Sequence, residues 1–187
     1  MITNEDARAA VASHLARRPQ DRLPLADALL ILDTAADLTR RESLPTHVTV
    51  GALCLDNDGH VLVVEHLAYG IPLQPGGHLK PEDRSLPEAA LRELVEECGI
   101  DPAHVTLVSA DPAYIEYGPV PARPSKGEPA HFHLDIGFIF TASHRLDTRA
   151  QTEEVASARW QPIDGIDHVL PGPVARALLE REPGWWS

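Results

Sequence analysis

The chain has 187 residues, of which 43% are hydrophobic and 24% are charged, as expected for a globular protein with a sizeable core. It contains no apolar run of the ~20 residues that span a bilayer, and its N-terminus lacks the apolar stretch of a signal peptide, so we expect a cytoplasmic protein with no membrane partner. The net charge of −12, with 16 scattered Lys and Arg, argues against a nucleic-acid duplex as a partner. The only two cysteines, Cys54 and Cys98, lie in apolar segments, which fits buried thiols in a reducing compartment.

The N-terminal region is expected to be helical. Residue patterning predicts helices at residues 6–17 and 24–40, separated by a break that contains proline. We therefore treat residues 1–44 as a helical extension and residues 45–187 as the main domain. The two helices could pack on that domain, cover its binding cleft or form the interface of a homodimer, and the sequence does not choose among these three.

From residue 47 onward, β-branched and apolar segments alternate with helical ones. A turn signal at residues 56–59 predicts a hairpin, and a loop rich in glycine and proline then leads to a helix that Gly99 should end in a left-handed cap. The predicted strands are residues 47–56, 60–66, 104–110, 113–118, 131–142 and 154–163, and the predicted helices are residues 86–98 and 174–182. This order predicts an α/β or α+β layered domain, preceded by the helical extension.

The segment GGHLKPEDRSLPEAALRELVEECGI, at residues 76–100, carries the chemistry. Glu93, Glu96 and Glu97 stand at positions i, i+3 and i+4 of the predicted helix, so their carboxylates project from one face. Three like charges this close repel one another unless a cation lies among them. Because Mg²⁺ and Mn²⁺ prefer carboxylate ligands, the pattern indicates a site for one of these ions.

The loop before this helix supports the same interpretation. Gly76 and Gly77 allow backbone conformations that other residues avoid, so a carbonyl group could turn toward the metal ion. Arg92 could pair with Asp83 and hold the loop against the helix. An E-x-x-E-E pattern alone would fit an ordinary solvated helix face. Its combination with the two glycines, the arginine and the terminal glycine argues against that plainer interpretation.

These residues resemble the Nudix box, whose pattern is G-x5-E-x7-R-E-U-x-E-E-x-G-U, where U is a bulky aliphatic residue. The second half, R-E-L-V-E-E-C-G-I from Arg92 to Ile100, matches at every fixed position. In the first half, the acid that follows Gly77 after five residues is Asp83 instead of glutamate, and eight residues rather than seven separate it from Arg92. The resemblance implies the Nudix fold, an α/β/α sandwich with a mixed β-sheet.

The resemblance also implies a function, the hydrolysis of a diphosphate linkage in a small nucleotide-like compound with Mg²⁺ or Mn²⁺ as cofactor. By similarity, the three helix glutamates are metal ligands and catalytic residues, one of them doubling as general base, and the Gly77 carbonyl is a further ligand. Arg92 joins the catalytic set and pairs with Asp83. Members of the family often use another acid from outside the box, for which Glu154 is our first candidate and Glu153 the second. An exposed loop explains these last two residues equally well.

A second group of polar residues is predicted on the strand at residues 131–142. His131, His133 and Asp135 alternate along it and share one face, which we expect to line the substrate cleft. A polar row on a half-exposed strand is the plainer alternative for any single histidine. The residues expected to point the other way, into the core, are Phe132, Leu134 and Ile136.

Two further residues are candidate substrate contacts. His78 follows the paired glycines and could contact a phosphate, although loop histidines are often only surface residues. Tyr117 lies seventeen residues beyond Ile100, near the place where Nudix enzymes that act on diadenosine polyphosphates carry a tyrosine that stacks on a base. The resemblance therefore adds base stacking by Tyr117 as an expectation.

Two other functions remain open. A Nudix-fold isomerase of isopentenyl diphosphate needs a catalytic cysteine in a distinct upstream motif, and Cys54 lies in an apolar strand without that motif. A ligand-sensing Nudix domain with weak or lost catalysis usually lacks box glutamates, whereas this chain retains all three. The altered first half of the box keeps ligand sensing as the main alternative to hydrolysis.

Overall fold

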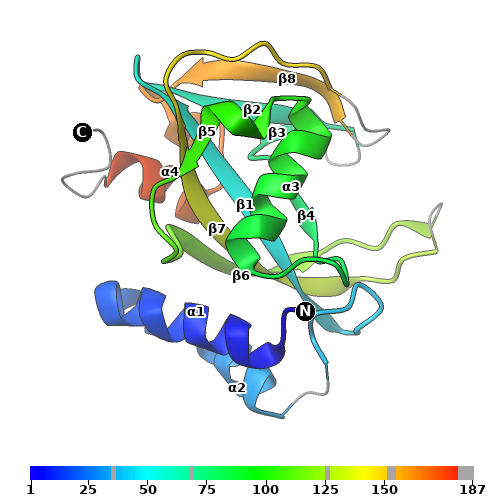
Figure 1. Ribbon diagram of the computed structural model, residues 1–187. Coiled ribbons are helices and arrows are strands. Elements are labelled where there is room, and N and C mark those ends of the chain that lie inside the picture. Colours follow the sequence, from blue (N-terminus) through cyan, green and yellow to red (C-terminus); the bar gives the residue numbers. More distant parts are fainter. Residues whose placement is uncertain (35–36, 68–69, 125–126, 151–154, 181–187) are drawn as a thin grey trace.

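The computed structural model describes residues 1–34, 37–67, 70–124, 127–150 and 155–180 of the chain (Figure 1). Its α-helices are α1 (Asn4–Arg17), α2 (Ala26–Thr34), α3 (Leu86–Cys98) and α4 (Gly172–Leu179), joined by short 3-10 helices at Pro19–Arg22, Pro102–His104 and Ile166–His168. Its strands are β1 (Thr46–Asp56), β2 (His60–His66), β3 (Ile71–Leu73), β4 (Gly76–His78), β5 (Val105–Leu107), β6 (Tyr114–Val120), β7 (His131–Ala142) and β8 (Val155–Pro162). No helix of the described residues is both long enough and apolar enough to cross a membrane.

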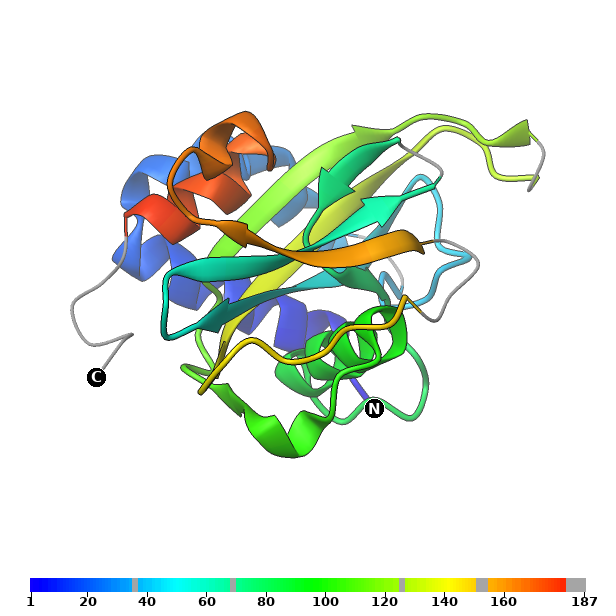
Figure 2. The same cartoon turned by 90° about the horizontal axis from the view of Figure 1, so that it is seen from above.

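The strands form one mixed sheet in the described residues, with β1 and β7 as its parallel centre. Every other pairing is antiparallel: β4 and β2 share the far edge of β1, β5 and β6 share the far edge of β7, and β2 also pairs with β3 and β8. Helices α3 and α4 cover opposite faces of this sheet (Figures 1 and 2). The predicted α/β/α sandwich with a mixed sheet is therefore confirmed.

The two N-terminal helices pack on the face of the sheet that α3 also covers. Val11 of α1 and Leu32 of α2 are buried in the same apolar cluster as Leu94 of α3. The segment between the helices is also tied to α4, because the buried Asp21 carboxylate bonds to His14 Nε2 at 2.9 Å and to Arg176 Nη2 at 2.8 Å. The extension is thus part of the folded core.

Three predicted elements differ from those observed. The segment before α3, expected to be a loop, contains the short strands β3, which pairs with β2, and β4, whose two glycines pair with the edge of β1. The strand expected at residues 104–110 is only Val105–Leu107, and α2 ends at Thr34. Phe132, expected in the core, is 38% exposed, because the hairpin of β6 and β7 extends past the helices there and the ring stacks on Tyr117 instead.

Along β1 and β7, one face of the sheet changes from polar to apolar. The parallel register places His47 beside His133, Thr49 beside Asp135 and Gly51 beside Gly137, and then Leu53 beside Ile139. Leu53 and Ile139 lie in the apolar cluster under α4, whereas the two polar pairs lie beyond that helix. The same face of the sheet therefore forms a hydrophobic core at one end and presents polar side chains at the other.

A tyrosine closes the boundary between these two regions. Tyr114, from β6, is fully buried and lies across Gly51 and Gly137. A Cβ on Gly137 would lie 1.8 Å from Tyr114 Cε1, and one on Gly51 would lie 2.0 Å from its hydroxyl oxygen, so the ring fits only because both positions lack side chains. Its hydroxyl donates to Asp135 Oδ2 at 2.7 Å and thereby fixes that carboxylate.

We expect Gly137→Ala to lower the free energy of unfolding by about 3 kcal/mol or more, because overpacking a filled core forces the Tyr114 ring or the strand to move. Urea unfolding measures this. Gly172→Ala is the matched control, since its Cβ would meet open space, and we expect it to change stability by less than about 0.5 kcal/mol. Equal effects of the two substitutions would contradict this role of Gly137.

Candidate active site

Helix α3 is well defined by its local sequence. The Ser85 side chain accepts a hydrogen bond from the Glu88 N–H at the N-terminus, and Gly99 ends the helix with φ 64° and ψ 24°. The left-handed cap predicted at Gly99 is therefore confirmed. The apolar side of the helix, including Leu94 and Cys98, is buried against the sheet, which directs the acidic side toward β4.

Two of the three box glutamates lie against the paired glycines of β4. The Gly76 N–H donates to Glu97 Oε2 at 3.0 Å. A Cβ on Gly77 would come within 2.8 Å of the Glu93 carboxylate, so that carboxylate occupies the space a side chain would need. Glu93 and Glu97 are both buried, at 8% and 5% exposure, which is unusual for glutamates.

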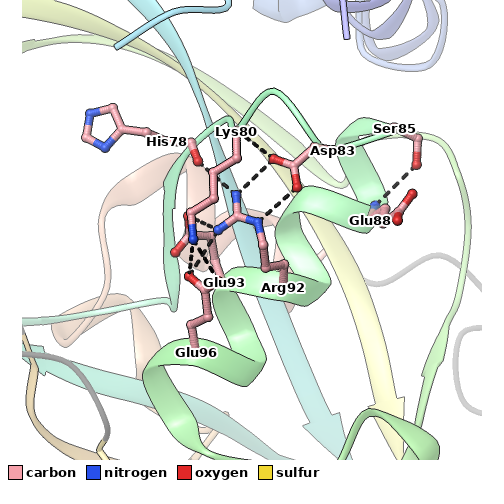
Figure 3. A network of polar contacts seen from close by, with 8 residues as sticks. All are labelled: His78, Lys80, Asp83, Ser85, Glu88, Arg92, Glu93 and Glu96. Atoms are coloured by element: carbon pink, nitrogen blue, oxygen red, sulfur yellow. Dashed lines mark hydrogen bonds and ion pairs between the residues drawn. The ribbon is translucent and has the colours of Figure 1, made fainter. Parts of the chain in front are cut away.

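Arg92 connects the loop, the helix and β4 (Figure 3). Its guanidinium donates to both carboxylate oxygens of Asp83 at 2.9 Å, to the His78 carbonyl at 2.9 Å, and to Glu93 Oε1 at 2.7 Å. Asp83 and Arg92 are thus paired although one extra residue lies between them, and the Asp83 carboxylate also accepts from the Lys80 N–H at 2.7 Å through Oδ2. The Asp83–Arg92 pair expected from the sequence is therefore present in the structure, and its geometry is bidentate.

Glu96, the third box glutamate, is partly exposed and is held by cations. Lys80 Nζ bonds to its two oxygens at 2.7 and 2.9 Å, and Arg92 Nη1 donates to it at 3.1 Å (Figure 3). Two cationic side chains therefore offset part of the repulsion within the acidic cluster. Lys80 was not singled out by the sequence pattern, although its place between the glycines and the box acid was visible there.

The protonation of the cluster reflects these surroundings. Burial raises the pKa of Glu93, and the hydrogen bond and charge of Arg92 oppose this only in part. Burial would also raise the pKa of Asp83 and of Glu96, but hydrogen bonds from Arg92 and Lys80 bring the pKa of each below its ordinary value. A buried carboxylate with a raised pKa beside two ionised ones is the environment that a bound cation would relieve.

A cleft of about 280 Å³ opens beside β4 on the sheet face that carries the polar pairs. Its polar lining includes the predicted His78, His131, His133 and Asp135, and it also includes Gly76, Gly77, Gln74, Thr49, Glu116, Arg123 and Glu128. The cleft thus brings the glycine loop and the polar face of β7 together.

Two acids face each other across β6 and β7 in this cleft. Glu116 is the register partner of Asp135, and burial raises the pKa of both carboxyl groups, that of Glu116 further through the nearby Asp135. Asp135 is held by Tyr114, by Thr49 Oγ1 at 2.9 Å and by Gln74 Nε2 at 3.2 Å. Because two acids directly opposite each other destabilise a sheet, their presence in a cleft points to a functional use.

One predicted substrate contact is not brought to this cleft. Tyr117 points to the other face of β6, where it packs against the α3-side core, stacks on Phe132 and bonds to Thr46 through its hydroxyl at 3.1 Å. Glu154, with Glu153, lies outside the described residues. Conversely, His47 joins the cleft histidines, with its ring centroid 4.7 Å from that of His133, although the sequence showed it only as the start of an apolar strand.

Comparison with known protein families matches residues 45–180 to the NUDIX domain. Solved structures with the same fold include a C. elegans Ap4A hydrolase in a binary complex, with 15% identity, a TM-score of 0.56 and coverage of 71% of this chain and 93% of that one. They also include a NUDIX-family hydrolase from Clostridium perfringens, with 20% identity, a TM-score of 0.53 and coverage of 73% and 98%. A third is the NUDIX domain of Shewanella oneidensis NrtR in complex with ADP ribose, with 17% identity, a TM-score of 0.53 and coverage of 81% and 96%.

None of the curated proteins matches the chain. At the identities given above, the structural likeness establishes the fold, and the family match establishes the relationship. Because that match extends over most of the chain, the protein belongs to the NUDIX domain family, the family of the Nudix hydrolases.

Proposed function

We propose that the protein is a metal-dependent hydrolase that cleaves the diphosphate linkage of a small nucleotide-like compound. The observation that carries the proposal is the burial of Glu93 and Glu97 against the paired glycines of β4, with Arg92 and Lys80 bracing the third carboxylate. Burying carboxylates costs free energy, and a purely structural helix face would leave them in water. A role in holding a cation explains why they are kept there.

The residues present fit Mg²⁺ or Mn²⁺. The donors are carboxylate oxygens from Glu93, Glu96 and Glu97, to which the Gly77 carbonyl can be added, and these hard oxygen donors are the kind that both ions bind. The absence of a side chain at Gly77 keeps the Glu93 carboxylate close to the backbone of β4. Glu154 is proposed as an additional acid from outside the box.

When bound, such an ion lowers the pKa of a coordinated water and offsets the negative charge of the phosphates. The chain itself supplies position and charge. Arg92 fixes Glu93 and Glu96 relative to the Asp83 loop, and Lys80 adds a positive charge at the same place. One of the glutamates, once ionised, is suited to accept the proton of the attacking water.

The cleft beside β4 is the proposed place for the rest of the substrate. His78 and His133 offer ring nitrogens there, and Asp135 and Glu116 offer carboxyl groups that can hydrogen-bond to hydroxyls or to a base edge. Two similar structures, an Ap4A hydrolase and a NUDIX domain in complex with ADP ribose, support a substrate of the nucleoside diphosphate-linked class. Base stacking by Tyr117 is not part of this proposal, because its ring faces away from the cleft.

Of the two alternatives, the isomerase finds no support in the structure. Cys54 is completely buried on the α3 face of β1, and burial raises the pKa of its thiol to about 12, so it neither faces the cleft nor ionises readily. Ligand sensing remains the second candidate function, because one similar structure is the NUDIX domain of NrtR with ADP ribose. It is distinguished from hydrolysis by binding without turnover.

The test is release of phosphate and nucleotide from a panel of nucleoside triphosphates, ADP-ribose, NADH, diadenosine polyphosphates and CoA. We expect Mg²⁺- or Mn²⁺-dependent cleavage of one class of compound, abolished by a chelator and restored when the ion is returned. Tight binding of a panel member without any turnover at saturating metal would overturn the hydrolase proposal in favour of ligand sensing.

A further inference from the structure

Four histidine rings on three different strands gather together, and three of them line the cleft. They are His47 of β1, His78 of β4, and His131 and His133 of β7. The Nε2 atoms of His78 and His47 lie 3.1 Å apart, and those of His131 and His133 lie 3.0 Å apart. One ligand nitrogen from each of His47, His78 and His133 can be chosen so that all three lie within 4.8 Å of one another.

Backbone carbonyls fix the orientation of two of these rings. His47 Nδ1 lies 3.1 Å from the Ser43 carbonyl oxygen, and His131 Nδ1 lies 2.8 Å from that of Pro129. Because a carbonyl only accepts, each Nδ1 carries the hydrogen and donates it, which leaves the Nε2 lone pair of each ring directed into the cluster. Histidines that bind metal ions are held in this way, with the second ring nitrogen donating to a carbonyl or carboxylate.

The cluster offers lone pairs rather than positive charge. Burial, followed by the neighbouring imidazoles, lowers the pKa of His133 to about 3, and burial also lowers the pKa of His47. Both rings are therefore neutral at pH 7. Arg123 is the arginine among the cleft-lining residues, and it would be the natural ligand of a phosphate. Its Nε already donates to Glu128 Oε2 at 2.7 Å. These features fit a cation better than an anion.

We propose that His47, His78 and His133 form a binding site for Zn²⁺ or a similar transition-metal ion, distinct from the carboxylate site on α3. Imidazole nitrogens suit zinc, whereas Mg²⁺ prefers oxygen ligands. In tetrahedral zinc sites the ligand nitrogens lie about 3.3 Å apart, as follows from Zn–N distances of about 2.0–2.1 Å. The three histidine nitrogens, which lie within 4.8 Å of one another, have to move closer together to reach that spacing.

His78 belongs to both regions through different atoms. Its carbonyl accepts from Arg92 beside the box glutamates, while its ring points away from those carboxylates (Figure 3). His78 and His133 also line the cleft, so a water or a substrate oxygen can reach a fourth coordination position. Three protein ligands with an open fourth position are the arrangement that zinc sites in enzymes use. The site does not depend on the hydrolase activity proposed above.

Zinc binding tests the proposal directly. Metal-free protein is titrated with Zn²⁺ in competition with a chromophoric chelator, in the presence of saturating Mg²⁺ so that the carboxylates are occupied. We expect one equivalent to bind, and we expect His133→Ala and His78→Ala each to weaken binding by at least about 100-fold, the upper end of what the loss of a mere outer-shell partner causes. The exposed His168→Ala is the matched control and should bind as the wild type does.

Two further measurements separate the possible results. Glu97→Gln should leave zinc affinity unchanged, which distinguishes this site from the α3 carboxylates even if no substrate of the enzyme is found. Nitrogen chemical shifts of the histidine rings in the wild type should change on zinc addition for the three ligands and not for His168, which avoids any doubt about the folding of variants. Absence of zinc binding under Mg²⁺, or binding that is lost in Glu97→Gln and kept in His133→Ala, overturns the proposal.

Discussion

Glu97→Gln is expected to lower kcat/KM for the diphosphate substrate by about 10²–10³-fold, the loss typical when one group that stabilises transition-state charge is removed. The substitution removes one negative charge from the metal site and keeps the shape of the side chain. Its amide oxygen can still accept the hydrogen bond from the Gly76 N–H. Steady-state kinetics, with Mn²⁺ affinity measured alongside, should show weaker metal binding together with slower turnover.

Although Glu97→Gln lowers activity, it should not lower the stability of the protein. Without metal, the neutral amide relieves repulsion with Glu93 and Glu96, so we expect an equal or higher Tm than that of the wild type. Glu88→Gln, on the exposed side of the first turn of the same helix, is the matched control and should leave turnover unchanged. Loss of activity in both variants, or in neither, would argue against a metal site at Glu97.

Arg92→Ala is expected to lower the free energy of unfolding by about 3 kcal/mol, because it leaves the buried Asp83 carboxylate without its partner and removes the cation beside Glu93 and Glu96. Urea unfolding at pH 7 measures the loss. The control is Arg84→Ala, an exposed position in the same loop, for which we expect a change within about 0.5 kcal/mol. Similar losses for the two alanine variants would show that the network contributes little.

The same pair predicts a pH dependence. Because the pKa of Asp83 is lowered in the folded protein, its contribution is present above the ordinary value of about 4 and is lost as the pH falls through the lowered pKa. The difference in unfolding free energy between the wild type and Asp83→Asn should therefore be largest near pH 7 and shrink below about pH 4. A difference that stays constant down to pH 2 would contradict this origin of the stability.

The helix of the active site could be predicted from the sequence because its signals are local. The periodicity of its apolar residues, the cap at Gly99 and the spacing of the three glutamates all lie within residues 76–100. The Asp83–Arg92 pair also forms despite the inserted residue, with Arg92 Nε and Nη2 donating to the two carboxylate oxygens. Interactions between residues this close in the chain can be predicted without knowing how the strands pair.

The cleft was less accessible to sequence reasoning because it depends on strand register. His47 meets His133 across 86 residues of chain, and Glu116 meets Asp135 only through the pairing of β6 with β7. That same pairing turns Tyr117 away from the cleft, so its distance from the box along the chain was not informative. The alternating polar residues His47 and Thr49, at the start of a strand rich in apolar residues, were the visible sign that β1 contributes to the site.

The most direct test of the metal site is anomalous diffraction from crystals of the protein soaked with Mn²⁺. We predict a manganese peak within coordination distance of the Glu93 and Glu97 carboxylates and the Gly77 carbonyl. A manganese peak confined to the histidines of the cleft, or no peak near α3 at saturating Mn²⁺, would contradict it.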